Sequence, residues 1–396
     1  LDRLIFDARV IETEADGESA IYLPAMYQAE GEVARMLLEL SAAVEQGEMN
    51  DAEARIARYE RENGVELCQA QRDGVITAAG CGVTVITGGP GTGKTTSINC
   101  IIRLMSSLGE IALTAPTGRA AKRMTETTGC PAKTIHRLLE YGGDEESFQK
   151  NQENQLKVKT VIVDEMSMVD VFLMRSLLRA LKPGTRLVLV GDADQLPSVG
   201  AGNVLRDIID SGVVPVVRLT EIFRQAGESM IVTNAHRINH GQMPQMNGKQ
   251  TDFFLERKEN AQQVAETVVA LVKQRLPGYM GFDPLRDIQV MAPMKKGDVG
   301  VWRLNRLLQE KLNPKRPGVT FNGDMGFITD INPEEQTLTV TFDDDREAVY
   351  DDAAQEELEL AYCVSVHKSQ GSEFNAVIIP VLGGFDKLYF RNLLYT

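Results

Sequence analysis

The residues with the clearest chemical meaning form the run Gly88-Gly89-Pro90-Gly91-Thr92-Gly93-Lys94-Thr95-Thr96. Small residues let a backbone fold tightly around a polyphosphate, while Lys94 supplies a positive charge and the Thr95 hydroxyl a ligand for Mg²⁺. The apolar residues 83–87 before the run predict a buried strand, and residues 95–108 after it predict a helix. A glycine-rich turn could carry some of these glycines, but the full spacing between a strand and a helix indicates a site for a nucleoside triphosphate.

A pair of acidic residues, Asp164 and Glu165, follows the short apolar strand Val161-Ile162-Val163. Such a strand would bring both carboxylates to the carboxyl edge of a parallel sheet, where open α/β sheets bind ligands. Asp164 would then hold Mg²⁺ and Glu165 would polarise an attacking water. An Asp-Glu pair also occurs in solvated turns, so it is the phosphate loop upstream that favours the catalytic interpretation.

The composition is that of a globular protein with more than one domain. The chain has 396 residues, 43% of them hydrophobic and 25% charged, and this length predicts roughly two to three domains. No apolar stretch approaches the roughly 20 residues that span a bilayer, so we expect a cytoplasmic protein without a membrane partner. The five cysteines are scattered, which argues against a metal cluster or a disulfide framework. Leu1 in place of methionine predicts a piece of a longer protein.

The formal net charge of −14 opposes non-specific binding to nucleic acid, because attraction to phosphate dominates such binding. Any nucleic acid must therefore be held locally. One local group of basic residues comprises Arg119, Lys122, Arg123, Lys133, His136 and Arg137. We expect the acidic run 343–359 to be a solvated face. The only tryptophan, Trp302, invites a base-stacking role, but its helical spacing favours the core or a helix surface.

The predicted elements form two α/β blocks behind a helical N-terminal segment, residues 1–65, which we interpret as the remnant of a larger N-terminal domain. The first block, 66–225, has a hairpin insertion at 141–159, and its predicted strands are 83–87, 110–115, 160–164, 186–191 and 216–219. The second block, 226–396, has predicted strands at 287–291, 360–366 and 376–381. Short β segments separated by turn residues predict a small β barrel inserted at about 317–355.

Six further segments stand in a fixed order with the phosphate loop and the acidic pair. They are 67–71, 114–121, 134–139, 191–199, 219–225 and 364–373. Each is weak alone, but together they resemble the motifs of RecD-like superfamily 1 DNA helicases, the exodeoxyribonuclease V alpha subunit family, from about Tyr22 to Thr396. The resemblance implies an α/β fold of two RecA-like P-loop NTPase lobes, parallel sheets flanked by helices, with ATP and Mg²⁺ in the cleft between them.

The resemblance also implies roles for individual residues. Gln71 would read adenine, Gln195 would sense the γ-phosphate and Arg224 would reach the triphosphate from across the cleft. The implied catalytic residues are Lys94, Asp164, Glu165, Gln195 and Arg224, with Thr95 and Asp164 at the metal. The implied nucleotide-binding residues are Gln71, Gly88, Gly89, Pro90, Gly91, Thr92, Gly93, Lys94, Thr95, Thr96, Gly371 and Glu373. The implied DNA-binding residues are Pro116, Thr117, Gly118, Arg119, His136, Ser198, Val199, His367, Lys368, Ser369 and Gln370.

The activity that the resemblance implies is that of an ATP-dependent DNA helicase or translocase. It would move on single-stranded DNA, 5′ to 3′, in recombination or repair, either alone or with nuclease or other repair subunits. Two alternatives stay open. One is an RNA or RNA–DNA translocase, because motor motifs hardly contact the sugar. The other is a nucleotide-gated interaction module without unwinding activity, which the acidic charge balance favours.

Overall fold

The computed structural model describes the chain except residues 16, 45–50, 143–146, 224–228, 247–250, 315–318, 323, 343–345 and 384–390. It divides into two compact units, Leu1–His236 and Arg237–Thr396, which we call unit 1 and unit 2. The lobe boundary predicted at residue 225 lies outside the described residues. Within the described ranges, no helix is both long enough and apolar enough to cross a membrane.

Unit 1 contains a six-stranded parallel sheet, and the five strands that the sequence predicts are all present in it. The spatial order is β10-β3-β9-β8-β4-β5. The strands are β3 (Val83–Gly88), β4 (Ile111–Ala115), β5 (Ala132–Thr134), β8 (Thr160–Val163), β9 (Arg186–Gly191) and β10 (Val216–Leu219). Strand β5 was not predicted, because three residues with a central lysine carry no apolar pattern; its pairing with the neighbouring β4 defines it.

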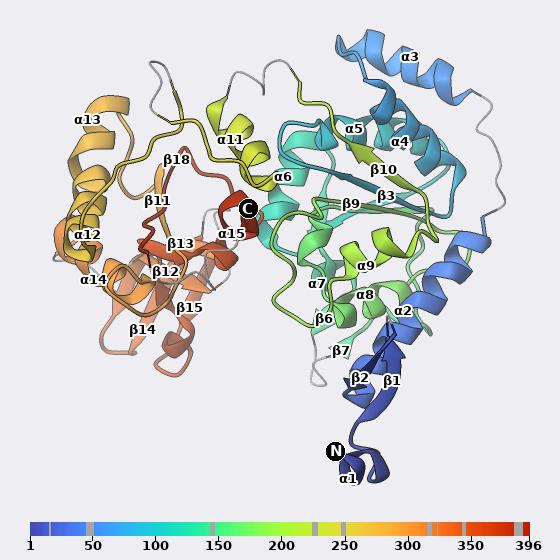
Figure 1. The fold of residues 1–396 in the computed structure, drawn as a ribbon, viewed down its shortest axis with the longest axis horizontal. Helices are drawn as coiled ribbons and strands as arrows, with labels where there is room; N and C mark the ends of the chain where they lie inside the picture. The colour runs from blue at the N-terminus through green and yellow to red at the C-terminus, as the bar shows by residue number, and fades with distance from the viewer. Residues whose placement is uncertain are drawn as a thin grey trace. The chain divides into compact units, whose positions relative to one another are not determined.

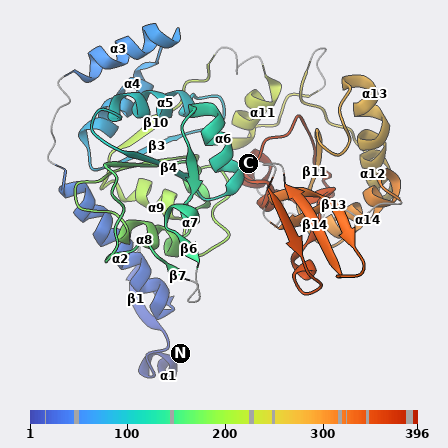
Figure 2. The same ribbon diagram turned by 180° about the vertical axis from the view of Figure 1, so that it is seen from behind.

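Helices cover both faces of this sheet, as Figures 1 and 2 show. They are α2 (Pro24–Ala42), α3 (Ala52–Asn63), α4 (Gln69–Gly80), α5 (Lys94–Met105), α6 (Gly118–Thr128), α7 (Ile135–Leu138), α8 (Val171–Arg179) and α9 (Val204–Ser211). The boundary between the two units falls within α11 (Met230–Asn239). Alternate side chains of β8 belong to two cores, one on each face of the sheet. Val161 and Val163 pack with α2, α8 and α9, while Ile162 packs with α3, α4 and α5. A parallel sheet must be covered in this way because its strands are apolar on both faces.

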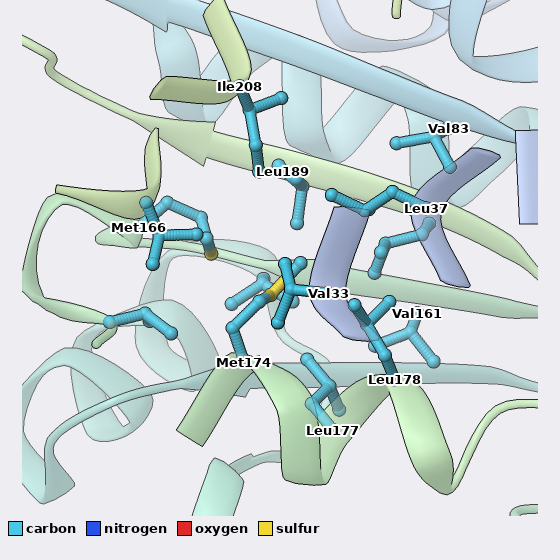
Figure 3. Packing of buried hydrophobic residues seen from close by; sticks show 14 of the residues in the cluster. Val33, Leu37, Val83, Val161, Met166, Met174, Leu177, Leu178, Leu189 and Ile208 are labelled. Atoms are coloured by element: carbon cyan, nitrogen blue, oxygen red, sulfur yellow. The ribbon is translucent and has the colours of Figure 1, made fainter. Parts of the chain in front are cut away.

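The N-terminal segment is part of unit 1. It begins with α1 (Asp2–Phe6) and an antiparallel hairpin of β1 (Ile11–Ala15) and β2 (Glu18–Tyr22), so the segment predicted as helical over residues 1–65 also contains two strands. Helix α2 lies in the segment predicted as helical, and it buries Val33 and Leu37 against α8 (Figure 3). Helix α3 buries Ile56 in the core on the opposite face. The first 65 residues therefore supply cover to both faces of the sheet.

Within the segment predicted as a hairpin, β6 (Tyr141–Gly142) pairs antiparallel with β7 (Ser147–Phe148). The described residues 149–159, which lead up to β8, contain no helix or strand.

Unit 2 is built around a three-stranded parallel sheet with the order β17-β11-β18. Its strands are β11 (Ile288–Ala292), β17 (Cys363–Ser365) and β18 (Ala376–Ile378). Its helices are α12 (Ala261–Ala270), which continues through a π-turn (Leu271–Arg275) into α13 (Leu276–Met280), and α14 (Val301–Leu312) and α15 (Arg391–Tyr395). Leu304 and Leu308 of α14 are fully buried, and Asn305 fixes β17 through two 2.8 Å hydrogen bonds with the Cys363 backbone.

An antiparallel sheet is inserted between β11 and β17, in the segment predicted to form a small barrel. It consists of β12 (Val319–Asn322), β13 (Asp324–Asn332), β14 (Thr337–Phe342), β15 (Glu347–Tyr350) and β16 (Glu359–Leu360). The spatial order is β15-β14-β13-β12-β16, and the long strands β13 and β14 lie side by side in Figure 2. A bulge between Ile328 and Asp330 shifts the register of this central pair. Such a bulge bends and twists a sheet locally.

The packing of α2 generates a stability prediction. Leu37 is 5% exposed in the core and its neighbour Leu38 is 50% exposed. Leu37→Ala should lower the free energy of unfolding of unit 1 by about 2–5 kcal/mol, because it removes buried methyl groups and leaves a cavity. Leu38→Ala, the matched control on the same turn, should change it by less than about 0.5 kcal/mol. Urea denaturation measures both; equal effects would mean that α2 is not part of the unit 1 core.

Candidate nucleotide site and strand-binding segments

The phosphate loop joins β3 to α5 as a closed turn. Gly93 has a φ of 79°, in the left-handed region that favours glycine, and α5 begins at the next residue. The Thr92 hydroxyl donates to the Gly89 carbonyl at 2.8 Å, and the Lys94 ammonium donates to the carbonyls of Gly88 at 2.7 Å and Gly89 at 3.1 Å. The Lys94 ammonium therefore lies over the phosphate loop, where its charge is suited to bind a phosphate.

The acidic pair lies at the carboxyl edge of the same sheet, at the end of β8. The Asp164 N–H donates to the carbonyl of Thr114 in the adjacent β4 at 2.9 Å, which fixes the chain as it leaves the sheet. Glu165 has a φ of 54°, an uncommon conformation for a residue with a side chain. Its N–H donates to the Asp164 carboxylate at 2.9 Å. Backbone conformations of this kind cost free energy and cluster at functional sites.

Burial and charge determine the proton affinity of the two carboxyls. Burial raises the pKa of Asp164, against the opposing influence of the Glu165 N–H and of the Lys94 and Arg123 charges. Burial raises the pKa of Glu165 to about 7, and the neighbouring Asp164 carboxylate adds to the effect. Lys94 and Arg123 again oppose it, so both cations face this pair. Arg123, which the sequence placed only in a general basic group, is thus part of the electrostatics of the site.

The oxygen donors at this edge fit a magnesium ion. Mg²⁺ prefers hard oxygen ligands and is usually held by one or two protein groups together with substrate phosphates and water. The Asp164 carboxylate and the Thr95 hydroxyl are such groups. Among the described residues, no group of three or more His, Cys, Asp or Glu side chains could hold a metal by itself. A metal held jointly with a nucleotide is therefore the arrangement that these residues suit.

Gln71 is fully buried beside the phosphate loop. Its side-chain N–H donates to the Gly93 carbonyl at 3.1 Å, and its side-chain oxygen accepts from the Cys68 N–H at 3.0 Å, capping α4. A side chain on Gly93 would collide with this amide and would approach the Phe223 ring to 2.8 Å. Gln71 therefore ties the start of α4 to the loop at a glycine that no larger residue could replace.

Two contacts to the loop were not foreseen from the sequence. The Phe223 N–H donates to the Gly91 carbonyl at 3.2 Å, and the His236 ring nitrogen Nε2 lies 3.1 Å from the Pro90 carbonyl oxygen. A single histidine within a helix carries no recognisable signal, so nothing in the sequence could have identified His236. Arg224 follows Phe223 in the sequence and lies outside the described residues.

The segment that contains Gln195 follows β9, the strand next to β3. The Ala193 N–H is 3.4 Å from the Thr87 hydroxyl at the end of β3, and the Gln195 N–H donates to the carbonyl of the buried Asp192 at 3.3 Å. Further along, the Ser198 hydroxyl donates to the carbonyls of Gly200 and Gly202 at 3.1 and 2.9 Å, while Val199 is 84% exposed. The serine shapes its own loop and leaves the valine at the surface.

Besides Ser198 and Val199, the predicted strand-binding residues of unit 1 lie at the start of α6 and in α7. Pro116, Thr117 and Gly118 follow the end of β4, and Thr117 caps α6 by accepting from the Ala120 N–H at 3.3 Å. Arg119 is partly exposed on the first turn of that helix. His136 is exposed, and its ring lies 5.7 Å from that of Tyr141 and 5.6 Å from that of Phe148.

In unit 2 the predicted residues lie just after β17, on a 3-10 turn (Val366–Ser369). His367 is exposed and Lys368 partly exposed, so both are accessible. Ser369 and Gln370 are buried, and the Ser369 hydroxyl donates to the Val366 carbonyl at 2.8 Å. Gly371, with a φ of 72°, and the exposed Glu373 follow. The accessible lysine and histidine are suited to an external ligand, whereas the buried pair holds the turn together.

Two family models match the chain at the segments just described. Residues 71–201 match the model of an AAA domain, which spans Gln71, the phosphate loop and the acidic pair. Residues 360–396 match the model of a UvrD-like helicase C-terminal domain, which spans β17 and the turn after it. Solved structures of a Candida albicans Pif1 helicase and of a Bacteroides Pif1 helicase with ADP-AlF3 and single-stranded DNA are also similar. The first has 19% identity and a TM-score of 0.47 and the second 18% and 0.45; the alignments cover 84% and 79% of this chain, and 92% and 86% of those chains.

Two curated relatives match most of the chain. The ATP-dependent RecD2 DNA helicase of Deinococcus radiodurans is 35% identical over 97% of this chain, which spans about half of that protein (54%). The RecBCD enzyme subunit RecD of Mycolicibacterium smegmatis is 30% identical over 83% of this chain and 68% of its own length. Identity of this extent, together with a phosphate loop and an acidic pair at one edge of a parallel sheet, establishes that the chain belongs to the RecD family.

Proposed function

We propose that this protein is an ATP-dependent DNA helicase that translocates on single-stranded DNA. The observation that carries the proposal is the meeting of Lys94, Asp164 and Glu165 at the carboxyl edge of one parallel sheet, with Gln71 fixed against the phosphate loop. The names of the relatives support DNA as the polymer. Movement 5′ to 3′ and a role beside nuclease or other repair subunits belong to the same proposal.

Each residue has a distinct part in the proposed hydrolysis. Lys94 and the loop backbone bind the triphosphate, and Thr95 and Asp164 would hold a Mg²⁺ ion, which would neutralise charge on the phosphates. Glu165 orients the attacking water and accepts its proton, a task suited to a carboxyl whose burial raises its pKa to about 7. Gln195 senses the γ-phosphate, and Arg224 stabilises the charge that develops on the phosphoryl group.

The strand is gripped by both units in this proposal. Arg119 and His136 of unit 1, and His367 and Lys368 of unit 2, offer exposed or partly exposed donors to phosphates. Such local contacts suit a chain with a net charge of −14, which repels nucleic acid at long range. Alternate gripping by the two units, timed by ATP, would move the strand.

ATPase assays with short oligonucleotides test the substrate of the complete protein. Single-stranded DNA should stimulate hydrolysis strongly and RNA of the same sequence weakly. Equal stimulation by RNA would favour an RNA or RNA–DNA translocase. Nucleotide binding without stimulation by either polymer would favour a nucleotide-gated interaction module.

The first prediction separates nucleotide binding from turnover. Lys94→Ala should weaken ATP affinity roughly 10- to 100-fold, because it removes a charged hydrogen bond to phosphate. Glu165→Gln should leave ATP bound but lower kcat by about 10²–10⁴, because only the action on water is lost. Equilibrium ATP binding and steady-state hydrolysis measure the two effects. Lys182→Ala, an exposed lysine of unit 1, is the control. Normal DNA-stimulated turnover by Glu165→Gln would exclude its assigned role.

The second prediction concerns the choice of base. The Gln71 amide both donates and accepts, as the adenine edge requires, so Gln71→Ala should raise the KM for ATP and reduce the preference for ATP over GTP. Gln69→Ala removes an exposed amide from the same helix and should leave both quantities unchanged. Competition between the two nucleotides measures the preference. Equal use of all four triphosphates by the wild type would remove the basis for this role.

The third prediction separates strand contact from nucleotide contact. Arg119→Ala should weaken oligonucleotide binding and make its logarithmic salt dependence shallower by about 0.7, because one phosphate fewer is neutralised. Arg224→Ala should leave strand affinity nearly intact and abolish DNA-stimulated hydrolysis. Fluorescence anisotropy of a labelled oligonucleotide, titrated at several salt concentrations, measures strand affinity of the two variants, and ATPase assays measure their hydrolysis. Arg58→Ala on α3 is a charge-matched control; indistinguishable Arg119 and Arg224 phenotypes would contradict the gripping mechanism.

A further inference from the structure

An acidic side chain of unit 2 lies between two lysines that an external anion could use. The Glu359 carboxylate accepts from the Lys368 ammonium at 2.6 Å and lies 3.7 Å from the Lys295 ammonium. The hydrogen bond from Lys368 is the main reason why the pKa of Glu359 falls below its usual value. These side chains are 34–54% exposed, so the cluster is at the surface. Glu359 thus lies on the solvated acidic face that the sequence predicted, where it is paired with the two lysines.

Three parts of the unit 2 fold bring this cluster together. Glu359 belongs to β16, at the edge of the inserted antiparallel sheet, where it pairs with Phe321 of β12. Lys368 lies on the turn after β17, and Lys295 follows β11. The parallel sheet thus supplies both cations, and the inserted sheet supplies the anion between them.

An exposed indole lines the same place. Trp302 lies on the first turn of α14, is 55% exposed, and donates its backbone N–H to the Lys295 carbonyl at 3.1 Å. The Lys296 ammonium is 5.6 Å from the centroid of its ring. Trp302, Lys295, Glu359 and Lys368 line one small hollow, together with Val364 and Ser365. A large aromatic surface beside two lysines is the combination that binds single-stranded nucleic acid, with bases on the ring and phosphates at the cations.

We propose that the exposed groups around this hollow, Trp302 and the two lysines, bind one nucleotide of a single strand of DNA at the surface, as a subsite within the function proposed above. The base stacks on Trp302, and its phosphate replaces Glu359 between Lys295 and Lys368. The Glu359 carboxylate and the phosphate carry charge of the same sign, so they exclude each other from the place between the two lysines. Glu359 therefore competes with each phosphate that enters, weakens the grip of unit 2 and makes release of the strand easier.

Fluorescence of Trp302 tests the stacking directly. Addition of oligo(dT) to the complete protein should quench the emission, and Trp302→Phe gives the background to subtract. The quenching should have the same midpoint as the anisotropy of a labelled oligonucleotide. Trp302→Ala should weaken affinity about 5- to 100-fold, since stacking is lost. Tyr279→Ala, which removes an aromatic residue that is 82% exposed elsewhere in unit 2, should have no effect.

Substitution of Glu359 tests whether its carboxylate competes with the phosphate of a bound strand. Glu359→Gln should strengthen oligo(dT) binding several-fold and steepen the logarithmic salt dependence by about 0.7, because both lysines become available to a phosphate. Glu310→Gln removes the same charge from the partner of Lys311 on α14 and should leave affinity unchanged. Weaker binding by Glu359→Gln would instead mean that Glu359 only orients Lys368. Thermal melting of each variant checks that it is folded.

The two proposals fail in different ways. A wild-type protein that binds no oligonucleotide with any nucleotide overturns the helicase proposal and this one together. A wild type that binds strands and hydrolyses ATP in response, with Trp302→Ala and Glu359→Gln at wild-type affinity, leaves the helicase proposal in place and overturns the subsite.

Discussion

The site in unit 1 depends on a charge balance at the edge of a buried sheet. Asp164 and Glu165 are adjacent carboxyls, and burial raises the pKa of both. Desolvated like charges repel strongly, so the pair is sustained by the opposite charges of Lys94 and Arg123. Without Lys94 and Arg123, the pKa of Glu165 would be higher still. Without the carboxylates, the phosphate loop would lack the group that acts on water.

Backbone geometry brings these charges to one place. In a parallel sheet every strand ends at the same edge, so residues after β3, β8 and β9 meet there although they are far apart in the sequence. Hydrogen bonds then fix the loops that emerge: Gln71 to Gly93, Phe223 to Gly91 and Asp164 to Thr114. The bonds of Gln71 and Phe223 anchor the phosphate loop, and the bond of Asp164 fixes the start of the acidic pair, so neighbouring elements determine where both parts of the site lie.

In unit 2, too, loops that follow strands bring charged side chains together, but there one carboxylate lies between two lysines. Its exposed cations, Lys295 and Lys368, follow strands of a parallel sheet, and the inserted antiparallel sheet supplies the anion Glu359. In the proposed subsite, this anion competes with the phosphate of a bound strand, which would ease release of the strand. The insertion therefore adjusts the charge of the unit that carries it.

The sequence by itself determined the elements whose signals are local. The glycine spacing of the phosphate loop, the apolar run before Asp164 and the five predicted strands of unit 1 are patterns within short windows, and the ordered motifs identified the family. Tertiary structure alone decided the pairing of β5 and the hydrogen bond of His236 to Pro90. It also decided the burial of Ser369 and the place of Glu359 between two lysines. These features depend on residues brought together from distant parts of the chain, and no local pattern encodes which distant partner a strand edge or a side chain will meet.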